Sequence, residues 1–138
     1  MRGADTLIPA RFLTLTSHLS AVITLLWESH KSTRHCLPSH FHDDHFQLYH
    51  NRLVAGLASS LALILLEFFT FLSGLTMFSS SSCLVSTAGH GSASIALTYF
   101  VIDGWLCDWY WPIFVLCSVV PSCIDVTVAF LTMCSVKW

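Results

Sequence analysis

Four long apolar stretches follow one another along the chain, and polar residues separate them. They cover residues 7–27, 53–78, 83–102 and 110–136. Each is long enough for a helix to cross a hydrocarbon core about 30 Å thick, which takes roughly 20 residues. The pattern predicts an all-α membrane protein. We expect a four-helix transmembrane bundle that forms a single domain over residues 1–138.

The connections between these stretches differ in length. Residues 28–52 form the one sizeable polar loop, whereas the serine run 79–82 is so short that the second and third helices are predicted to be antiparallel neighbours. Residues 103–109 are rich in tryptophan, which is typical of a membrane surface. Four crossings place both chain ends on one side. Lysine and arginine are divided evenly between the two sides, and acidic residues in loop 28–52 favour a non-cytoplasmic loop with cytoplasmic termini.

The composition agrees with a membrane protein and excludes several other classes. Hydrophobic residues make up 54% of the 138 residues, charged residues make up 10%, and the mean hydropathy is +0.68. A formal net charge of -2 provides no basic surface for nucleic acid. The sequence contains no phosphate-binding glycine loop, no Cys-x-x-Cys pair and no nucleophile beside a base. We therefore expect neither an enzyme nor a cofactor.

The third stretch is unusually rich in small residues. Those that we expect to pack against neighbouring helices are Ala88, Gly89, Gly91, Ser92 and Ala96. Small side chains let helix backbones come close to one another in lipid. The third helix is therefore expected to be surrounded by the others, with Gly91 at a position of close approach.

Each stretch also carries one ionisable residue well inside it, namely His18, Glu67, His90 and Asp125. The last three lie at one depth, roughly 20 Å from the surface that bears the long loop, at about 1.5 Å per residue. Polar groups at such depth face protein and not lipid. We expect Glu67, His90 and Asp125 to form one hydrogen-bonded cluster with His90 as the shared partner. Arg11 is expected to reach the lipid headgroups from the end of the first helix.

The long loop is rich in histidine, which suggests a metal site as one alternative. His40, His42 and His45 lie near Asp43 and Asp44, and imidazole and carboxylate groups are common metal ligands. Their spacing matches no standard zinc module. A solvated loop is the simpler interpretation, and no metal site is predicted.

Two of the six cysteines invite a disulfide. The other four lie in apolar stretches, where cysteine usually acts as a small hydrophobic residue. Cys36 and Cys107 are predicted to lie on the same side of the bilayer. If that side is lumenal, a disulfide between Cys36 and Cys107 joins the two loops, and if it is cytosolic, both remain free thiols.

The chain resembles the transmembrane protein 107 family of small four-pass proteins of the ciliary transition zone. The segments that carry the resemblance are, in order, IPARFLTLTSHL (8–19), CLP (36–38), QL (47–48), LVAGL (53–57), EFFTFLSGLTMF (67–78), GHGSASIAL (89–97) and WLCDWYWPIFVLCS (105–118). They extend over most of the chain. The specificity lies in their order and spacing together.

This resemblance implies a structural or scaffold component of the Meckel-syndrome module at the ciliary transition zone. Such a component serves cilium assembly, the protein composition of the ciliary membrane and Hedgehog signalling. The resemblance implies cytoplasmic termini, no enzymatic activity, and partners that include tectonic-type, B9-domain and other multi-pass proteins, all in or beside the lipid bilayer. The alternative function, taken from the residues alone, is a small proton or cation channel or transporter that uses Glu67, His90 and Asp125.

Overall fold

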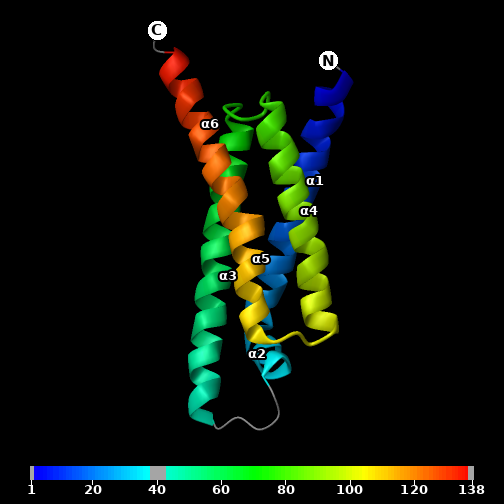
Figure 1. Cartoon of the computed structure of the whole chain (residues 1–138), viewed down its shortest axis with the longest axis vertical. Coiled ribbons are helices and arrows are strands. Elements are labelled where there is room, and N and C mark those ends of the chain that lie inside the picture. Colours follow the sequence, from blue (N-terminus) through cyan, green and yellow to red (C-terminus); the bar gives the residue numbers. More distant parts are fainter. Residues whose placement is uncertain (1, 38–42, 137–138) are drawn as a thin grey trace.

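The computed structural model describes residues 2–37 and 43–136, and over these residues the regular structure is helical. Four long rods form a bundle (Figure 1). They are α1 (Arg2–Trp27), α3 (Asp43–Leu72), α4 (Ser80–Ile102) and a composite last rod of α5 (Tyr110–Phe114), the π-helical segment η2 (Val115–Val119) and α6 (Val120–Val136). The short helix α2 (Ser29–Cys36) and the 3-10 turn η1 (Cys107–Trp109) lie at the end opposite the termini.

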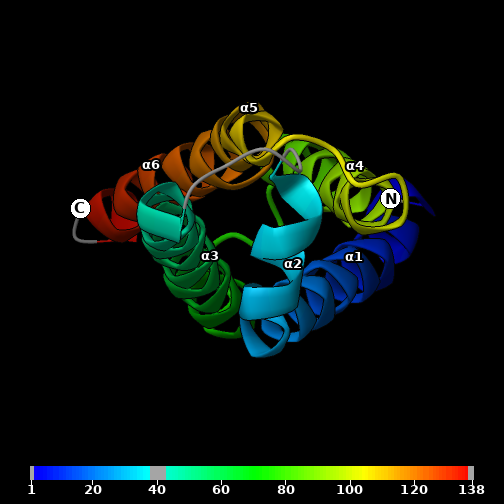
Figure 2. The same ribbon diagram turned by 90° about the horizontal axis from the view of Figure 1, so that it is seen from below.

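Seen along the bundle axis, the four rods lie at the corners of a quadrilateral (Figure 2). Their order around it differs from their order in the chain. α1 packs against α3 and α4, and α6 packs against the same two helices. α1 and α6 therefore face each other across one diagonal, and α3 and α4 face each other across the second. The prediction that the second and third helices are neighbours is wrong, although the two helices are antiparallel.

The connection between α3 and α4 explains this arrangement. α3 ends at Leu72 and not at residue 78, which leaves residues 73–79 to cross the diagonal. Gly74 has a φ of +80°, a left-handed conformation that glycine adopts without strain and that stops the helix. Ser79 then begins the next helix, because its side chain accepts a hydrogen bond of 3.4 Å from the backbone N–H of Ser82.

The bounds of the helices also differ at the long loop. The predicted loop 28–52 contains all of α2 and the first turns of α3, which starts at Asp43. The polar first turns of α3 therefore extend a membrane helix beyond its apolar part. Hydropathy locates the apolar part of such a helix and not the helix end.

Three helical segments of the described chain are long and apolar enough to cross a membrane: Thr6–Trp27, His45–Leu72 and Cys107–Val136. α4 has 23 residues and packs beside them, but it carries a buried polar row of Ser82, Ser86 and His90. That row lowers the hydropathy of α4 while facing protein. The chain is an all-α, multi-pass membrane protein, as predicted, and both termini lie at one end of the bundle (Figure 1).

One close contact positions the last rod near the long loop. A Cβ atom on Gly56 would lie 2.7 Å from Cε1 of Tyr110, so the missing side chain of this glycine gives the Tyr110 ring its place against α3. The Tyr110 hydroxyl is 2.8 Å from Oγ of Ser60, one turn further along α3. Sequence reasoning did not single out Gly56.

Candidate functional site

A buried ion pair joins the first and last rods across their diagonal. Nη2 of Arg11 in α1 lies 2.5 Å from Oδ1 of Asp125 in α6, and both side chains are fully buried. Asp125 also accepts hydrogen bonds from the hydroxyl groups of Thr70 and Ser82. Nη1 of Arg11 donates to Oγ1 of Thr76 at 3.2 Å. Thr76 belongs to the connection between α3 and α4, so that connection closes over the ion pair.

A second set of hydrogen bonds crosses the other diagonal. Glu67 in α3 is fully buried, and its Oε2 lies 2.9 Å from Nε2 of His90 in α4. The same carboxyl group accepts from Oγ of Ser86 at 3.1 Å and from Oγ of Ser122 at 2.7 Å. Since these serines belong to α4 and α6, Glu67 connects three rods.

The two diagonals meet in one polar cluster, whose members are Arg11, His18, Glu67, Thr70, Thr76, Ser82, Ser86, His90, Ser122 and Asp125. Arg11 Nη2 lies 4.0 Å from Glu67 Oε2. His18 Nδ1 lies 2.7 Å from His90 Nδ1, which adds a second residue of α1. Every long rod therefore contributes to the polar cluster, and each of its ionisable side chains is buried.

The structure brings the three predicted residues together but corrects how they are joined. His90 contacts Glu67 and His18, and Arg11 is the group that lies between Asp125 and Glu67. The expectations that His90 is the shared partner and that Arg11 reaches the headgroups are both wrong. Charged side chains within membrane helices usually face the interior of the bundle and pair with one another, and Arg11 does so with two carboxyl groups.

The chemistry of the polar cluster follows from its charges. Arg11 supplies one positive charge against two carboxyl groups, and His90 donates through Nε2 to the second of them. When His90 is neutral with its proton on Nε2, its Nδ1 accepts from Nδ1 of His18. Such a connected network fixes the relative heights of all four rods, because a shift of one rod leaves buried groups unpaired. A pocket between α1, α2 and α4 is lined by none of these residues.

Some of the small residues predicted to pack against other helices face a neighbouring rod, and others are exposed. Gly89 is the close approach, since a Cβ atom there would lie 2.7 Å from Cγ of Pro121, whereas a Cβ atom on Gly91 would meet Cγ2 of Thr14 at an ordinary 3.5 Å. Ala96 is half-buried. Ala88 and Ser92 are exposed, although the Ser92 hydroxyl lies 3.5 Å from Sγ of Cys117. Of the two glycines in the set, Gly89 is therefore the one at which a neighbouring rod leaves no room for a side chain.

The structure joins Cys36 and Cys107 in a disulfide, with a Cα–Cα distance of 5.0 Å. This bond links the end of α2 to η1, at the start of the last rod. Four further cysteines of the described chain are free: Cys83, Cys117, Cys123 and Cys134.

The histidines considered for a metal site lie mostly beyond what the structure describes. His40 and His42 fall outside the described residues. Within residues 2–37 and 43–136, no group of three His, Cys, Asp or Glu side chains is arranged to hold a metal ion.

Comparison with known proteins agrees with this picture of the chain. The model of the TMEM107 family, described as a transmembrane protein, matches residues 7–129. Transmembrane protein 107 of Mus musculus is 43% identical over 131 residues, which is 95% of this chain and 93% of that protein. The Danio rerio protein is 42% identical over 125 residues (91% and 93%), and the Homo sapiens protein is 41% identical over 131 residues (95% and 93%). No solved structure matches the chain significantly. This chain belongs to the TMEM107 family of multi-pass membrane proteins.

Proposed function

We propose that this protein is a structural membrane component of the ciliary transition zone, within the Meckel-syndrome module. In that role it supports cilium assembly, the protein composition of the ciliary membrane and Hedgehog signalling. Membership of the TMEM107 family supports the proposal, together with the resemblance of the ordered sequence segments. The proposed site of action is the transition-zone membrane, with the chain termini in the cytoplasm.

The observation that supports the scaffold role is that the buried polar groups bond to one another. The buried ionisable groups of all four rods pair with one another inside the bundle. The outward faces carry large apolar side chains, among them Leu65, Phe69, Ile95, Leu116 and Phe130. A molecule built in this way acts through what its outer surface contacts. We assign no residue a catalytic role.

The proposed partners are membrane proteins of the same zone. Tectonic-type, B9-domain and other multi-pass proteins are the classes that we expect to be recovered with this chain. Nearly all of its described surface lies along or next to the membrane rods, so the contacts are expected in the bilayer or at its edges. In the bilayer, close packing of small residues and hydrogen bonds between polar side chains can hold this chain to its partners.

Imaging of a tagged full-length copy in ciliated cells that lack the endogenous protein tests the proposal. We expect the tag at the ciliary base and restored cilium number and Hedgehog response. A variant that replaces the ion pair with apolar side chains, Arg11→Leu with Asp125→Leu, should restore both wherever it assembles with its disulfide intact, because a scaffold needs no chemistry from these groups. Even distribution of the tag over other membranes would contradict the proposal.

One observation favours a proton or cation relay as the second candidate. His18, His90 and Glu67 form a continuous hydrogen-bonded chain from α1 through α4 to α3. Proton flux into proteoliposomes that contain the purified protein separates the two functions. A relay predicts flux above that of empty liposomes and loss of the flux in a well-assembled His90→Leu protein, whereas a scaffold predicts no flux from either protein.

A further inference from the structure

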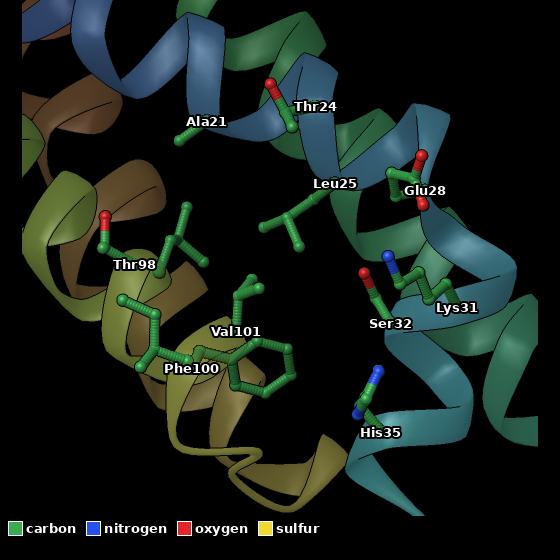
Figure 3. A pocket seen from close by; sticks show the side chains of 12 residues that line it. Ala21, Thr24, Leu25, Glu28, Lys31, Ser32, His35, Thr98, Phe100 and Val101 are labelled. Carbon is green, nitrogen blue, oxygen red and sulfur yellow. The ribbon is translucent and has the colours of Figure 1, made fainter.

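A pocket lies at the end of the bundle that bears the disulfide, between α1, α2 and α4 (Figure 3). Its volume is about 500 Å³. This size is within the range of roughly 300–1,000 Å³ that small-molecule sites occupy. The polar cluster described above contributes nothing to it.

The pocket has an apolar half and a charged half. Leu25, Leu97 and Phe100 form its buried wall, from the facing sides of α1 and α4. Lys31 and His35 lie one turn apart on α2 and point toward the cavity, and Glu28 stands beside Lys31 (Figure 3). None of the side chains of Glu28, Lys31 and His35 makes a hydrogen bond or ion pair with another described residue. The charged half therefore has donors and an acceptor left to offer a ligand.

The position of the pocket relative to the membrane suggests its occupant. α1 ends at Trp27 and α4 ends at Ile102, so the pocket lies at the level where both rods are expected to leave the hydrocarbon. Its rim includes the exposed side chains of Thr98, Val101 and Ile102 on α4. An apolar cavity that opens beside a transmembrane helix is in direct reach of lipid.

We propose that this pocket binds one zwitterionic glycerophospholipid, with an acyl chain along the Leu25, Leu97 and Phe100 wall and the headgroup against α2. The phosphate would accept hydrogen bonds from Lys31 and His35, and the headgroup amine would donate to the Glu28 carboxylate. An anionic lipid would bring a second negative group to Glu28. A sterol has one hydroxyl group and would leave these charges unused.

The headgroup of choice is ethanolamine. A primary ammonium donates hydrogen bonds to a carboxylate, whereas a quaternary ammonium is recognised mainly by a cage of aromatic rings. Apart from the imidazole of His35, which is assigned to the phosphate, Phe100 is the one aromatic side chain among the twelve residues that line the pocket, and it belongs to the apolar wall. Phosphatidylethanolamine therefore fits better than phosphatidylcholine.

The disulfide holds the headgroup part of the site in place before a lipid binds. Cys36 ends α2 and is bonded to Cys107, so the helix that carries Lys31 and His35 is tied to the last rod. A headgroup site that is already in place loses less free energy on ordering when the lipid binds. Reduction of the disulfide is expected to weaken lipid retention.

Native mass spectrometry of the purified full-length protein tests the proposal. The protein is exchanged into an equimolar mixture of phosphatidylethanolamine, phosphatidylcholine and phosphatidylglycerol, and the retained lipid is identified. We expect one phosphatidylethanolamine per chain. Lys31→Gln should lower its occupancy on the order of tenfold, whereas Arg34→Gln, which removes the same charge from α2 outside the pocket, should leave it unchanged. A preference for phosphatidylglycerol in the unmodified protein, or equal loss in both variants, would overturn the proposal.

Two further variants test the amine site and the cavity separately. Glu28→Gln should abolish the preference for ethanolamine over glycerol headgroups. Ala21→Phe fills the cavity and should exclude the lipid, while the same substitution at Ala62, which is exposed on α3 and far from the lining, should not. Loss of lipid from the Ala62→Phe protein as well would count against a defined site.

Photolabelling of the unmodified protein does not depend on any variant folding. Phosphatidylethanolamine that carries a diazirine in its acyl chain should label peptides around Leu25 and residues 97–102 above all others. The site does not exist if labelling is equal along the exposed faces of α3 and α6. This experiment is independent of the proposed ciliary role, since it needs only the purified chain.

Discussion

Arg11 and Asp125 bond to each other across the diagonal of the bundle, although α1 and α6 do not pack side by side. The guanidinium group reaches over the bundle axis, and its Nη2 lies 2.5 Å from Oδ1 of Asp125. Glu67 and His90 bond across the other diagonal at 2.9 Å. The two crossings meet at one level, so the polar cluster holds together rods that share little direct packing.

The ion pair predicts that removing one member lowers stability more than removing both. Arg11→Met leaves Asp125 as a buried charge without its cation, which should lower the free energy of unfolding by about 3–5 kcal/mol. The double variant with Asp125→Leu should lose less than the single variant, because the carboxyl group in closest contact with Arg11 is gone and Glu67 keeps its hydrogen bonds from Ser86, His90 and Ser122. Titration with a denaturing detergent followed by tryptophan fluorescence measures both. Arg52→Met, at an exposed arginine of α3, is the control and should change stability by no more than about 0.5 kcal/mol.

The histidine pair predicts an order of effects. His90→Leu removes a donor from Glu67 and the partner of His18 together, whereas His18→Leu removes one contact of His90. An unpaired buried polar group costs about 1–3 kcal/mol, so the His90 variant should be the less stable of the two. Detergent titration of the two variants gives the comparison. Equal loss would show that the hydrogen bond between His90 and Glu67 adds no net stability.

Two glycines in α4, two residues apart, predict opposite results for the same substitution. Gly89→Ala places a Cβ atom 2.7 Å from the Pro121 ring and should cost about 1–3 kcal/mol through displacement of α6. Gly91→Ala meets Thr14 at 3.5 Å and should leave stability unchanged or raise it by up to about 1 kcal/mol, because alanine is the better helix former. Thermal unfolding of both proteins in one detergent compares them. Destabilisation by the Gly91 change alone would reverse the assignment of the close contact.

The disulfide predicts a redox dependence that is confined to one end of the molecule. Cys36→Ser should lower stability by about 2–5 kcal/mol and release α2 from η1. Reduction of the unmodified protein should have the same effect, and reduction of the Cys36→Ser protein should add nothing. Maleimide labelling before and after reduction reports the two thiols. Labelling of Cys36 without any reductant would show that the bond does not form.

Much of the membrane architecture was predictable from hydropathy, and the exceptions have physical causes. Leu75, Met77 and Phe78 are as apolar as the helix before them, so the sequence hides the point at which the left-handed Gly74 ends α3. The diagonal placement of α3 and α4 follows from that hidden end. A turn of four residues cannot cross a bundle, whereas residues 73–79 can.

The polar cluster was predictable in its depth and not in its connections. Depth needs only residue counts, and these placed Glu67, His90 and Asp125 together. The same count places Arg11 sixteen residues before Trp27 (27 − 11), or about 24 Å from the loop side at 1.5 Å per residue. That depth and the excess of carboxyl groups were the signals for its true partner. Which of several polar groups at one level bond to each other depends on the order of the rods around the bundle axis, which hydropathy does not encode.

The Arg11 contact also has a consequence for the making of the protein. Arg11 belongs to α1, which is synthesised before α6, the helix of Asp125. During translation the guanidinium group therefore lacks the carboxyl group of its shortest contact until α6 has been made. A nascent chain that lacks α6 leaves Arg11 with one of its two carboxyl partners, Glu67, which gives membrane quality control a mark that distinguishes chains without α6 from chains that contain it.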